Sequence, residues 1–359
     1  MKIARALVLI GSAFGSALAD EGRTRFPFDP VELVAGREIA GDERWSATHY
    51  LYSYQFASEA NYAAFLADPA KYEIQLGGAC ARMGPLSGRG RTNLHAVHDK
   101  KLYVFASEAC RKAFLKAPER LLETSEAPPA TDADGARRAR EWLEKAVAAH
   151  GGAAAIDGVK SLSERSERTD DGDNRVTEAR VFEFPDRARR DESWNESRWS
   201  SVSSGDRGWF LGSDERPMHA QQLWAFRREA LTRNLVRLLQ LRSDSKVALA
   251  DAGAGMLETP AGKRPVQRVT IAVDGSNQTL SLDVETGRVL AHAFRGRGPS
   301  AAIVEIERTF ADFVTVSGVL LPGTVTVRAD GSEPVTRTWR YEVNPALDAA
   351  TFAEPAWPQ

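Results

Sequence analysis

Residues 49–69, HYLYSYQFASEANYAAFLADP, recur as residues 98–118, HDKKLYVFASEACRKAFLKAP, at a constant offset of 49 residues. Eleven of the 21 aligned positions are identical, including the first histidine, the run Phe-Ala-Ser-Glu-Ala, a later phenylalanine and the final proline. A match of this length at one fixed spacing is the signature of an internal repeat. The sequence therefore predicts two copies of one structural unit.

Each copy has the pattern of a strand, a tight turn and a short helix. The aromatic and apolar runs at 54–56 and 102–105 are typical of strands. Ser58 and Ser107 then stand where a helix N-cap belongs, and a glutamate follows each. The closing proline ends each helix. Helices of roughly ten residues are marginal alone, so we expect the two copies to pack on each other.

These residues resemble the YHS domain family of small modules. The resemblance rests on YQFASEAN at 54–61, DPAKY at 68–72 and GGACA at 77–81. The second copy is similar to a branch of that family with the turn Tyr-x-Phe-Cys-Ser-x-x-Cys, in which Ala106 replaces the first cysteine and Cys110 is the second. The resemblance implies a module that binds a metal ion.

The composition is that of an ordinary globular protein with two cores. The chain has 359 residues, 43% of them hydrophobic and 27% charged, and a formal net charge of -2. This balance gives no electrostatic reason to expect a nucleic acid partner. The basic cluster at 187–190 is interpreted as a solvated face.

The first 19 residues have the pattern of a cleaved signal peptide. Lys2 and Arg5 precede an apolar run, and Ala17-Leu18-Ala19 matches a cleavage site. The residue directly after the predicted cleavage site is not a cysteine. No later stretch approaches the ~20 apolar residues of a transmembrane helix. We therefore expect a periplasmic or secreted protein without a transmembrane segment.

The rest of the chain divides into a flexible start at 20–27, a tandem YHS-like domain at 28–123, a linker at 124–136 and a second domain at 137–359. In the second domain a helix ending before Gly151-Gly152 is followed by many alternating strands, which a helix interrupts at 217–242. We expect one long antiparallel sheet with two helical insertions. About ten antiparallel strands cannot stay flat, so the sheet should curl into a half-barrel. The fold class is α+β.

This second domain resembles the LolA and LolB group of lipoprotein carriers and the related lipoprotein-sorting proteins. The shared phrases are His150-Gly151-Gly152, Gly208-Trp209, Asp283-x-x-Thr286-Gly287, GVLLP at 318–322 and VNP at 343–345, with Phe352. The resemblance implies a curved sheet whose concave face accepts acyl chains or another hydrophobic ligand. Four apolar side chains are candidates for the cavity wall: Trp199, Trp209, Leu223 and Phe226. For the tryptophans Trp194, Trp199, Trp209 and Trp224 the alternative is that they fill a core.

Both cysteines and three of the six histidines lie in the first domain. In an oxidising compartment the preferred interpretation is a Cys80 to Cys110 disulfide. The alternatives are free thiols, or a zinc or copper site built from Cys80, His95, His98 and Cys110. His49 and His98 occupy the same place in the two copies, which points to a role in packing.

No catalytic signature is present, since HExxH and GxSxG are both missing. We therefore expect an exported, non-enzymatic protein that binds a lipid, a lipoprotein acyl chain or another hydrophobic molecule, and also a metal ion or an envelope protein partner. One alternative is a thiol-dependent or metal-dependent redox protein or enzyme of the cell envelope that uses Cys110. Another is a structural interaction protein without a ligand.

Overall fold

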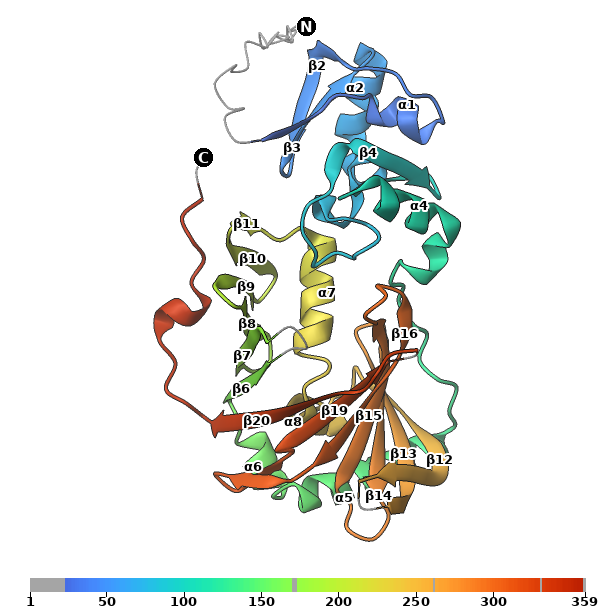
Figure 1. Cartoon of the computed structure of the whole chain (residues 1–359). Coiled ribbons are helices and arrows are strands. Elements are labelled where there is room, and N and C mark those ends of the chain that lie inside the picture. The colour runs from blue at the N-terminus through green and yellow to red at the C-terminus, as the bar shows by residue number, and fades with distance from the viewer. Residues whose placement is uncertain (1–22, 170–172, 261, 330, 358–359) are drawn as a thin grey trace, which may run out of the picture. The chain divides into compact units, whose positions relative to one another are not determined.

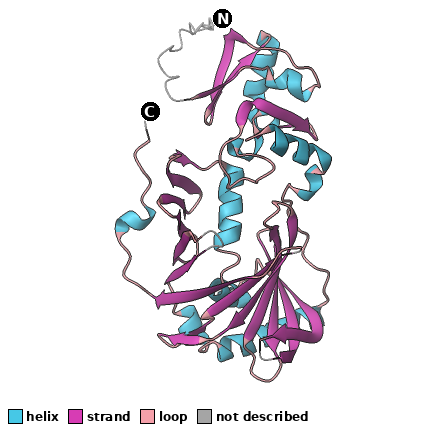
Figure 2. Ribbon diagram, viewed as in Figure 1, coloured by secondary structure: helices cyan, strands magenta, loops and turns pink. Residues whose placement is uncertain are grey.

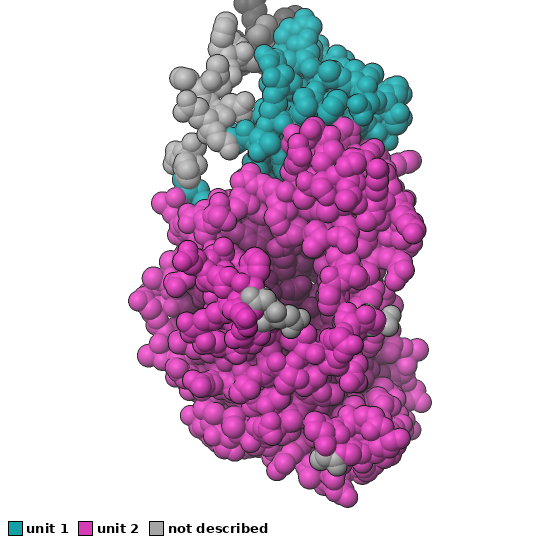
Figure 3. Space-filling view, in the orientation of Figure 1, with its two compact units in different colours: residues 1–72, 357–359 teal, residues 73–356 magenta. Residues whose placement is uncertain are grey.

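The computed structural model describes residues 23–169, 173–260, 262–329 and 331–357. The predicted signal peptide lies outside these residues. The chain forms two compact units, Met1–Tyr72 with Trp357–Gln359, and Glu73–Ala356, which Figure 3 colours separately. The boundary between the units falls inside the range predicted as one tandem domain, and each repeat copy belongs to a different unit.

The smaller unit contains the first repeat copy. Its three-stranded sheet has the order β1-β3-β2, and Thr24–Phe26, within the start that was expected to be flexible, pairs in parallel with β3. Ser58 caps α2 by accepting a hydrogen bond from the backbone of Asn61, as its sequence position predicts. The elements are β1 (Thr24–Phe26), α1 (Pro30–Val34), β2 (Asp42–His49), β3 (Tyr52–Phe56), α2 (Glu59–Ala67) and α3 (Pro69–Tyr72).

The second repeat copy opens the larger unit. A β4-β5 hairpin leads into α4, which Ser107 caps through the backbone of Cys110. The predicted strand, turn and helix are therefore confirmed in both copies. The elements are η1 (Gln75–Gly78), β4 (Arg91–His98), β5 (Lys101–Phe105), α4 (Glu108–Lys116) and η2 (Pro118–Arg120).

The repeated phenylalanine is the centre of each copy. The Phe65 ring lies 4.9 Å from Tyr54 and 5.9 Å from His49, centroid to centroid. The Phe114 ring lies 5.2 Å from Tyr103 and 6.0 Å from His98. In both copies the histidine meets the phenylalanine edge to face. The histidine is thus a packing residue of the unit, as its repetition predicted.

The main body of the larger unit is one antiparallel sheet of 13 strands in the described residues, in the order β11-β10-β9-β8-β7-β6-β20-β19-β16-β15-β14-β13-β12. Its strands fan and curl in Figure 1, and because β11 and β12 form separate edges the sheet does not close. The strands are β6 (Ser161–Thr169), β7 (Arg175–Glu183), β8 (Arg187–Trp194), β9 (Ser197–Ser204), β10 (Arg207–Gly212), β11 (Arg216–Pro217), β12 (Ala248–Thr259), β13 (Gly262–Val273), β14 (Ser276–Asp283), β15 (Val289–Arg297), β16 (Ile303–Ala311), β19 (Thr324–Ala329) and β20 (Val335–Val343).

Helices cover one face of this sheet (Figure 2). Leu143 and Val147 of α5 belong to the same core cluster as Val269 and Leu280 of the sheet. The helices are α5 (Ala133–Ala149), α6 (Ala153–Asp157), α7 (Ala220–Ala230), α8 (Leu235–Gln240), η3 (Leu241–Ser243) and η4 (Ala349–Phe352), and a separate hairpin joins β17 (Val314–Val316) to β18 (Val319–Leu321). No helix among the described residues is long and apolar enough to cross a membrane.

Two expectations about single elements are wrong. The helix predicted at 217–242 is broken at 231–234, where Asn234 caps α8 by accepting from the backbone of Arg237. The strand predicted at 245–250 continues as β12 to Thr259. Part of the predicted linker is also held to the sheet, because the Glu126 backbone donates to Gly275 at 2.8 Å.

Candidate ligand-binding cavity

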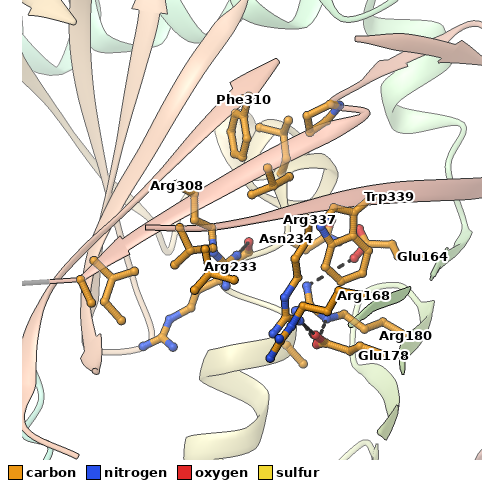
Figure 4. Close-up of a pocket in the computed structure, with 18 of the residues that line it drawn as sticks. Glu164, Arg168, Glu178, Arg180, Arg233, Asn234, Arg308, Phe310, Arg337 and Trp339 are labelled. Carbon is orange, nitrogen blue, oxygen red and sulfur yellow. Dashed lines mark hydrogen bonds and ion pairs between the residues drawn. The ribbon is translucent and has the colours of Figure 1, made fainter. Parts of the chain in front are cut away.

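A cavity of about 420 Å³ lies between the inner face of the sheet and the break between α7 and α8. Its walls come from strands β6, β7, β16, β19 and β20, together with residues 230–236 (Figure 4). It therefore occupies the place expected from the sequence, next to the helical insertion. A volume of this size is in the range of small-molecule sites, roughly 300–1,000 Å³.

The two-residue period of the strands sets which side chains face the cavity. In β16, Ile306, Arg308 and Phe310 alternate with residues on the opposite face, and all three line the cavity. Arg308 pairs directly with Val327 of β19, which lines the cavity as well. An inward arginine therefore stands between inward apolar side chains.

One part of the wall is apolar. Phe310, Leu321 and Trp339 are buried and leave at most 8% of their surface exposed. The apolar residues of the wall are Ala230, Leu235, Val236, Pro299, Ile306, Phe310, Leu321, Pro322, Val325, Val327, Ala329, Val335 and Trp339. This surface can contact a hydrocarbon chain.

The other part of the wall is charged, and arginines outnumber glutamates six to three. In Figure 4 Phe310 lies apart from the group formed by Glu178, Arg180 and Arg337. The charged residues are Glu164, Arg168, Glu178, Arg180, Arg233, Arg297, Arg308, Glu333 and Arg337.

Glu178 is the centre of the paired charges. Arg180 Nε donates to its carboxylate at 2.7 Å, and Arg337 donates to the other carboxylate oxygen. Burial alone would raise the pKa of Glu178, but Arg180, Arg337 and the nearby Arg190 outweigh it and lower this pKa to about 2. Glu178 is thus ionised and neutralises part of the arginine charge.

Glu164 is less well compensated. Its carboxylate lies 3.5 Å from Arg180 Nη1 and accepts from Asn234 Nδ2 at 3.0 Å. Burial nevertheless raises the pKa of Glu164, despite Arg180 and Arg308.

Arg233 and Arg308 have no carboxylate within 4.0 Å among the residues that the structure describes. Arg233 Nη2 donates to the Arg295 carbonyl at 3.1 Å, and Arg308 Nη1 donates to the Arg233 carbonyl at 3.3 Å. Both guanidinium groups lie over the Phe294 ring, at 4.2 Å and 4.9 Å from its centroid. Backbone carbonyls and an aromatic ring take the place of the usual ion pair.

The surroundings of these two side chains oppose their charge. Burial within the unit, reinforced by Arg180 and Arg233, lowers the pKa of Arg308 to about 9. Burial also lowers the pKa of Arg233. Both groups remain protonated at neutral pH, so the wall carries positive charge that protein carboxylates only partly balance.

A second hollow of about 50 Å³ lies beside the first and shares Arg180, Ala230, Arg233 and Arg308 with it. Its remaining lining residues are Phe182, Arg189, Arg190 and Glu229. Five of these eight residues are arginines and one is a glutamate. The hollow has room for a small polar group or a few waters.

Arg190 also corrects the interpretation of residues 187–190 as a solvated face. Its side chain is 19% exposed and pairs with Glu229 at 3.0 Å. Arg189 pairs with Asp191 at 2.9 Å. Both arginines belong to the wall of the small hollow.

The four cavity candidates chosen from the sequence are not among the lining residues of either hollow. Trp209 and Phe226 are buried, and Phe226 and Leu223 pack in the main core. Trp199 is 41% exposed and donates to Glu192 at 3.1 Å. For Trp209 the alternative interpretation, a core residue, describes its position.

Of the four residues considered for a metal, the structure brings together the two cysteines, which are free thiols in one packed cluster. His98 lies against Phe114 and 3.4 Å from the Asp99 carboxylate. No three His, Cys, Asp or Glu side chains in the described ranges converge in a way that could hold a metal ion. The disulfide and the zinc or copper site stay predictions.

The residues that sequence reasoning missed are the inward arginines. In VEIERTF at 304–310 an arginine alternates with isoleucine and phenylalanine, and in ARVF at 179–182 an arginine precedes the core residue Phe182 by two positions. An arginine on the apolar face of a strand pattern was the available signal.

No family model and no curated protein matches this chain. Solved structures that are similar to it include two with a TM-score of 0.39 each. One is a DUF1329 family protein from Desulfovibrio piger, 12% identical, with 60% of this chain and 97% of that chain covered. The other is a LolA superfamily protein from Nitrosomonas europaea, 10% identical, with the same coverage. These matches indicate neither a ligand nor an activity for this chain.

Proposed function

We propose that this protein binds an amphiphile with one hydrocarbon part and one anionic group in the cavity under the curled sheet. The observation that carries this proposal is the pair Arg233 and Arg308 next to an apolar wall. Neither guanidinium has a carboxylate within 4.0 Å among the described residues. A ligand with both features would complete the contacts that the protein leaves open.

The hydrocarbon part would lie along Phe310, Leu321, Val327 and Trp339. Transfer of a methylene group from water to such a surface contributes about 0.8 kcal/mol. A chain of several methylenes would therefore supply much of the affinity, and its length would be limited by the volume of about 420 Å³.

The anionic group would lie near Arg233 and Arg308, at the entrance to the small hollow that both residues share. A carboxylate or a phosphate there would accept charge-assisted hydrogen bonds and reduce the repulsion among the arginines. A neutral head group would leave that repulsion unchanged. The shared chemistry of the ligand class is thus an alkyl chain with a carboxylate or a phosphate.

The biological role that follows is carriage or sensing of such a molecule by an exported, non-enzymatic protein. A lipoprotein acyl chain or a free lipid would both supply the hydrocarbon part. A separate proposal is that the repeat-containing region at 28–123 binds a metal ion or a protein partner.

The test uses the full exported chain, delipidated and titrated with a fluorescent long-chain fatty acid and with a fluorescent phospholipid. Val327→Trp fills the cavity, whereas Arg328→Trp places the same side chain at the next, exposed position of β19. We expect Val327→Trp to weaken binding at least about tenfold, since it displaces several buried methylenes. Arg328→Trp should bind as the unmodified protein does.

The two probes distinguish a carboxylate ligand from a phosphate ligand. If Val327→Trp and Arg328→Trp bind both probes as tightly as the unmodified protein, the ligand is elsewhere and the cavity has no role in binding. If neither probe binds any of the three proteins, the proposal is wrong for this ligand class.

A further inference from the structure

Cys80 and Cys110, the two cysteines of the chain, form a site that the cavity does not use. They come from separate elements, since Cys80 follows η1 and Cys110 lies in the first turn of α4. The Cys80 backbone is fixed by a bridge to Val104 of β5 and by a hydrogen bond to the Gly88 carbonyl at 3.0 Å. Both sulfurs are therefore held in place by secondary structure.

The first repeat copy shows what normally occupies this position. There the Asp29 carboxylate accepts from the Ala57 backbone at 2.7 Å and from Asn61 Nδ2 at 2.7 Å. It also accepts from the backbone N–H of Val31 at 2.8 Å. Asp29 is fully buried, and these donors satisfy its carboxylate oxygens.

The second copy keeps the donors and changes the acceptor. The backbone N–H groups of Ala106, which corresponds to Ala57, and of Met83 act on the Cys80 thiol and lower its pKa. The Met83 N–H also donates to the Cys80 carbonyl at 2.8 Å. Cys110, which corresponds to Asn61, packs against the cluster that contains Cys80. A thiol thus occupies the place of a buried carboxylate, with a second thiol beside it.

The two thiols differ in accessibility. Cys80 is 1% exposed, and burial raises its pKa despite the two backbone donors. Cys110 is partly exposed. The Ser107 hydroxyl lowers the pKa of Cys110, and Cys80 and the Arg82 guanidinium act in the same direction. One thiol is partly exposed and has a lowered pKa, while the other is buried.

We infer that Cys110 and Cys80 form a thiol–disulfide exchange site for low-molecular-weight disulfides, with Cys110 as the attacking sulfur. The Cys110 thiolate attacks one sulfur of the disulfide, which gives a mixed disulfide and releases one thiolate. The Cys80 sulfur then attacks Cys110 and releases the second thiolate. The two protein thiols are oxidised to a Cys80–Cys110 disulfide, the substrate disulfide is reduced to two thiols, and the two protons pass to these thiols.

This inference is independent of the ligand in the cavity. It treats the disulfide expected from the sequence as the oxidised form of a reversible pair. A permanent bridge would need no partly exposed, polarised sulfur.

The experiment treats the reduced full-length chain with glutathione disulfide and follows the intact mass. Cys80→Ser should hold a stable glutathione adduct on Cys110, since no second sulfur can displace it. The unmodified protein should pass through this adduct and end as the internal disulfide without glutathione. Cys110→Ser should form an adduct at least about tenfold more slowly, because Cys80 is buried. Circular dichroism verifies that both variants are folded.

A second measurement equilibrates the unmodified protein in buffers of glutathione and glutathione disulfide. We expect a reversible midpoint within the range of these buffers. The inference is overturned if the bridge is reduced only after unfolding, which would make it a structural staple. It is equally overturned if the two single-cysteine variants react at the same rate, or if the unmodified protein retains two adducts.

Discussion

Two parts of the large sheet, β13 and β14 near the β12 edge and β16 and β19 in the middle, use the same alternating strands to different effect. One row of directly paired residues crosses five strands on a single face: Val269, Leu280, His292, Arg308 and Val327. Leu280 is fully buried in the main core, whereas Arg308 lines the cavity. Alternation therefore decides which face is inward, but it does not decide whether that face is filled.

The helices that cover each part explain the difference. Over the first part α5 runs without interruption over 17 residues and packs an apolar stripe on the sheet. Over the middle strands the covering helix is broken at 231–234, and Arg233 and Asn234 line the cavity there. A continuous helix makes a core, and an interrupted one leaves room for a ligand.

The largest expected effect is the loss of stability when the paired charges of the cavity wall are changed. Glu178→Gln removes the partner of Arg180 and Arg337, and we expect it to lower the free energy of unfolding by about 3–5 kcal/mol at neutral pH. Urea denaturation checks this. A loss below about 1 kcal/mol would mean that water already screens these ion pairs.

The pH dependence of the stability is a second test of the Glu178 carboxylate. The folded-state pKa of Glu178 is lowered to about 2 from an ordinary value of 4.5. Its contribution is therefore present above pH 4.5 and is lost as the pH falls toward 2, about 3 kcal/mol in all. The difference in stability between the unmodified protein and Glu178→Gln should narrow over this window. A constant difference would contradict the pairing.

The next prediction compares the cost of removing side-chain atoms in the filled core and in the cavity wall. Leu280→Ala leaves a void in a filled core, and we expect it to cost about 2–5 kcal/mol. Val327→Ala only enlarges an existing cavity, so its cost should be about 1 kcal/mol. Thermal and urea unfolding of both variants measure the contrast. Equal losses of stability in the two variants would show that the cavity wall is packed as tightly as the core.

The smallest effect concerns Arg308 itself. Arg308 has no carboxylate within 4.0 Å among the described residues. Arg308→Met replaces its charge by an apolar side chain of similar length. We expect the stability without ligand to stay within about 1 kcal/mol or to increase. Arg340→Met, an exposed arginine on the same sheet, is the matched control and should change stability very little. A loss above 2 kcal/mol would mean that Arg308 is structural.

Much of the fold could be predicted from the sequence, because strongly periodic segments identify themselves. The strand at 303–311 and the capping serines of the repeat follow from local residues. The break at 231–234 was missed because Leu231, Leu235 and Leu238 keep the helical period across it. The signal for it was Asn234, a good N-cap residue.

The cavity residues were harder to predict for a physical reason. Trp209 was favoured for a hydrophobic wall, but it fills space in the core. The wall instead contains Phe310 and Trp339, together with valines and arginines from strands far apart in the sequence. Only the strand register, which the sequence does not specify, brings Arg180, Arg308 and Arg337 to one hollow.

The central claim is that the cavity selects an anionic amphiphile through Arg233 and Arg308. The most direct test compares the affinity of the full chain for hexadecanoic acid and for hexadecanol, which share one alkyl chain, with Arg308→Gln and Arg340→Gln as variant and control. We predict that the unmodified protein and Arg340→Gln prefer the acid by at least about tenfold, and that Arg308→Gln loses most of this preference while it still binds the alcohol. Equal affinity of the unmodified protein for acid and alcohol, or an unchanged preference in Arg308→Gln, would contradict the claim.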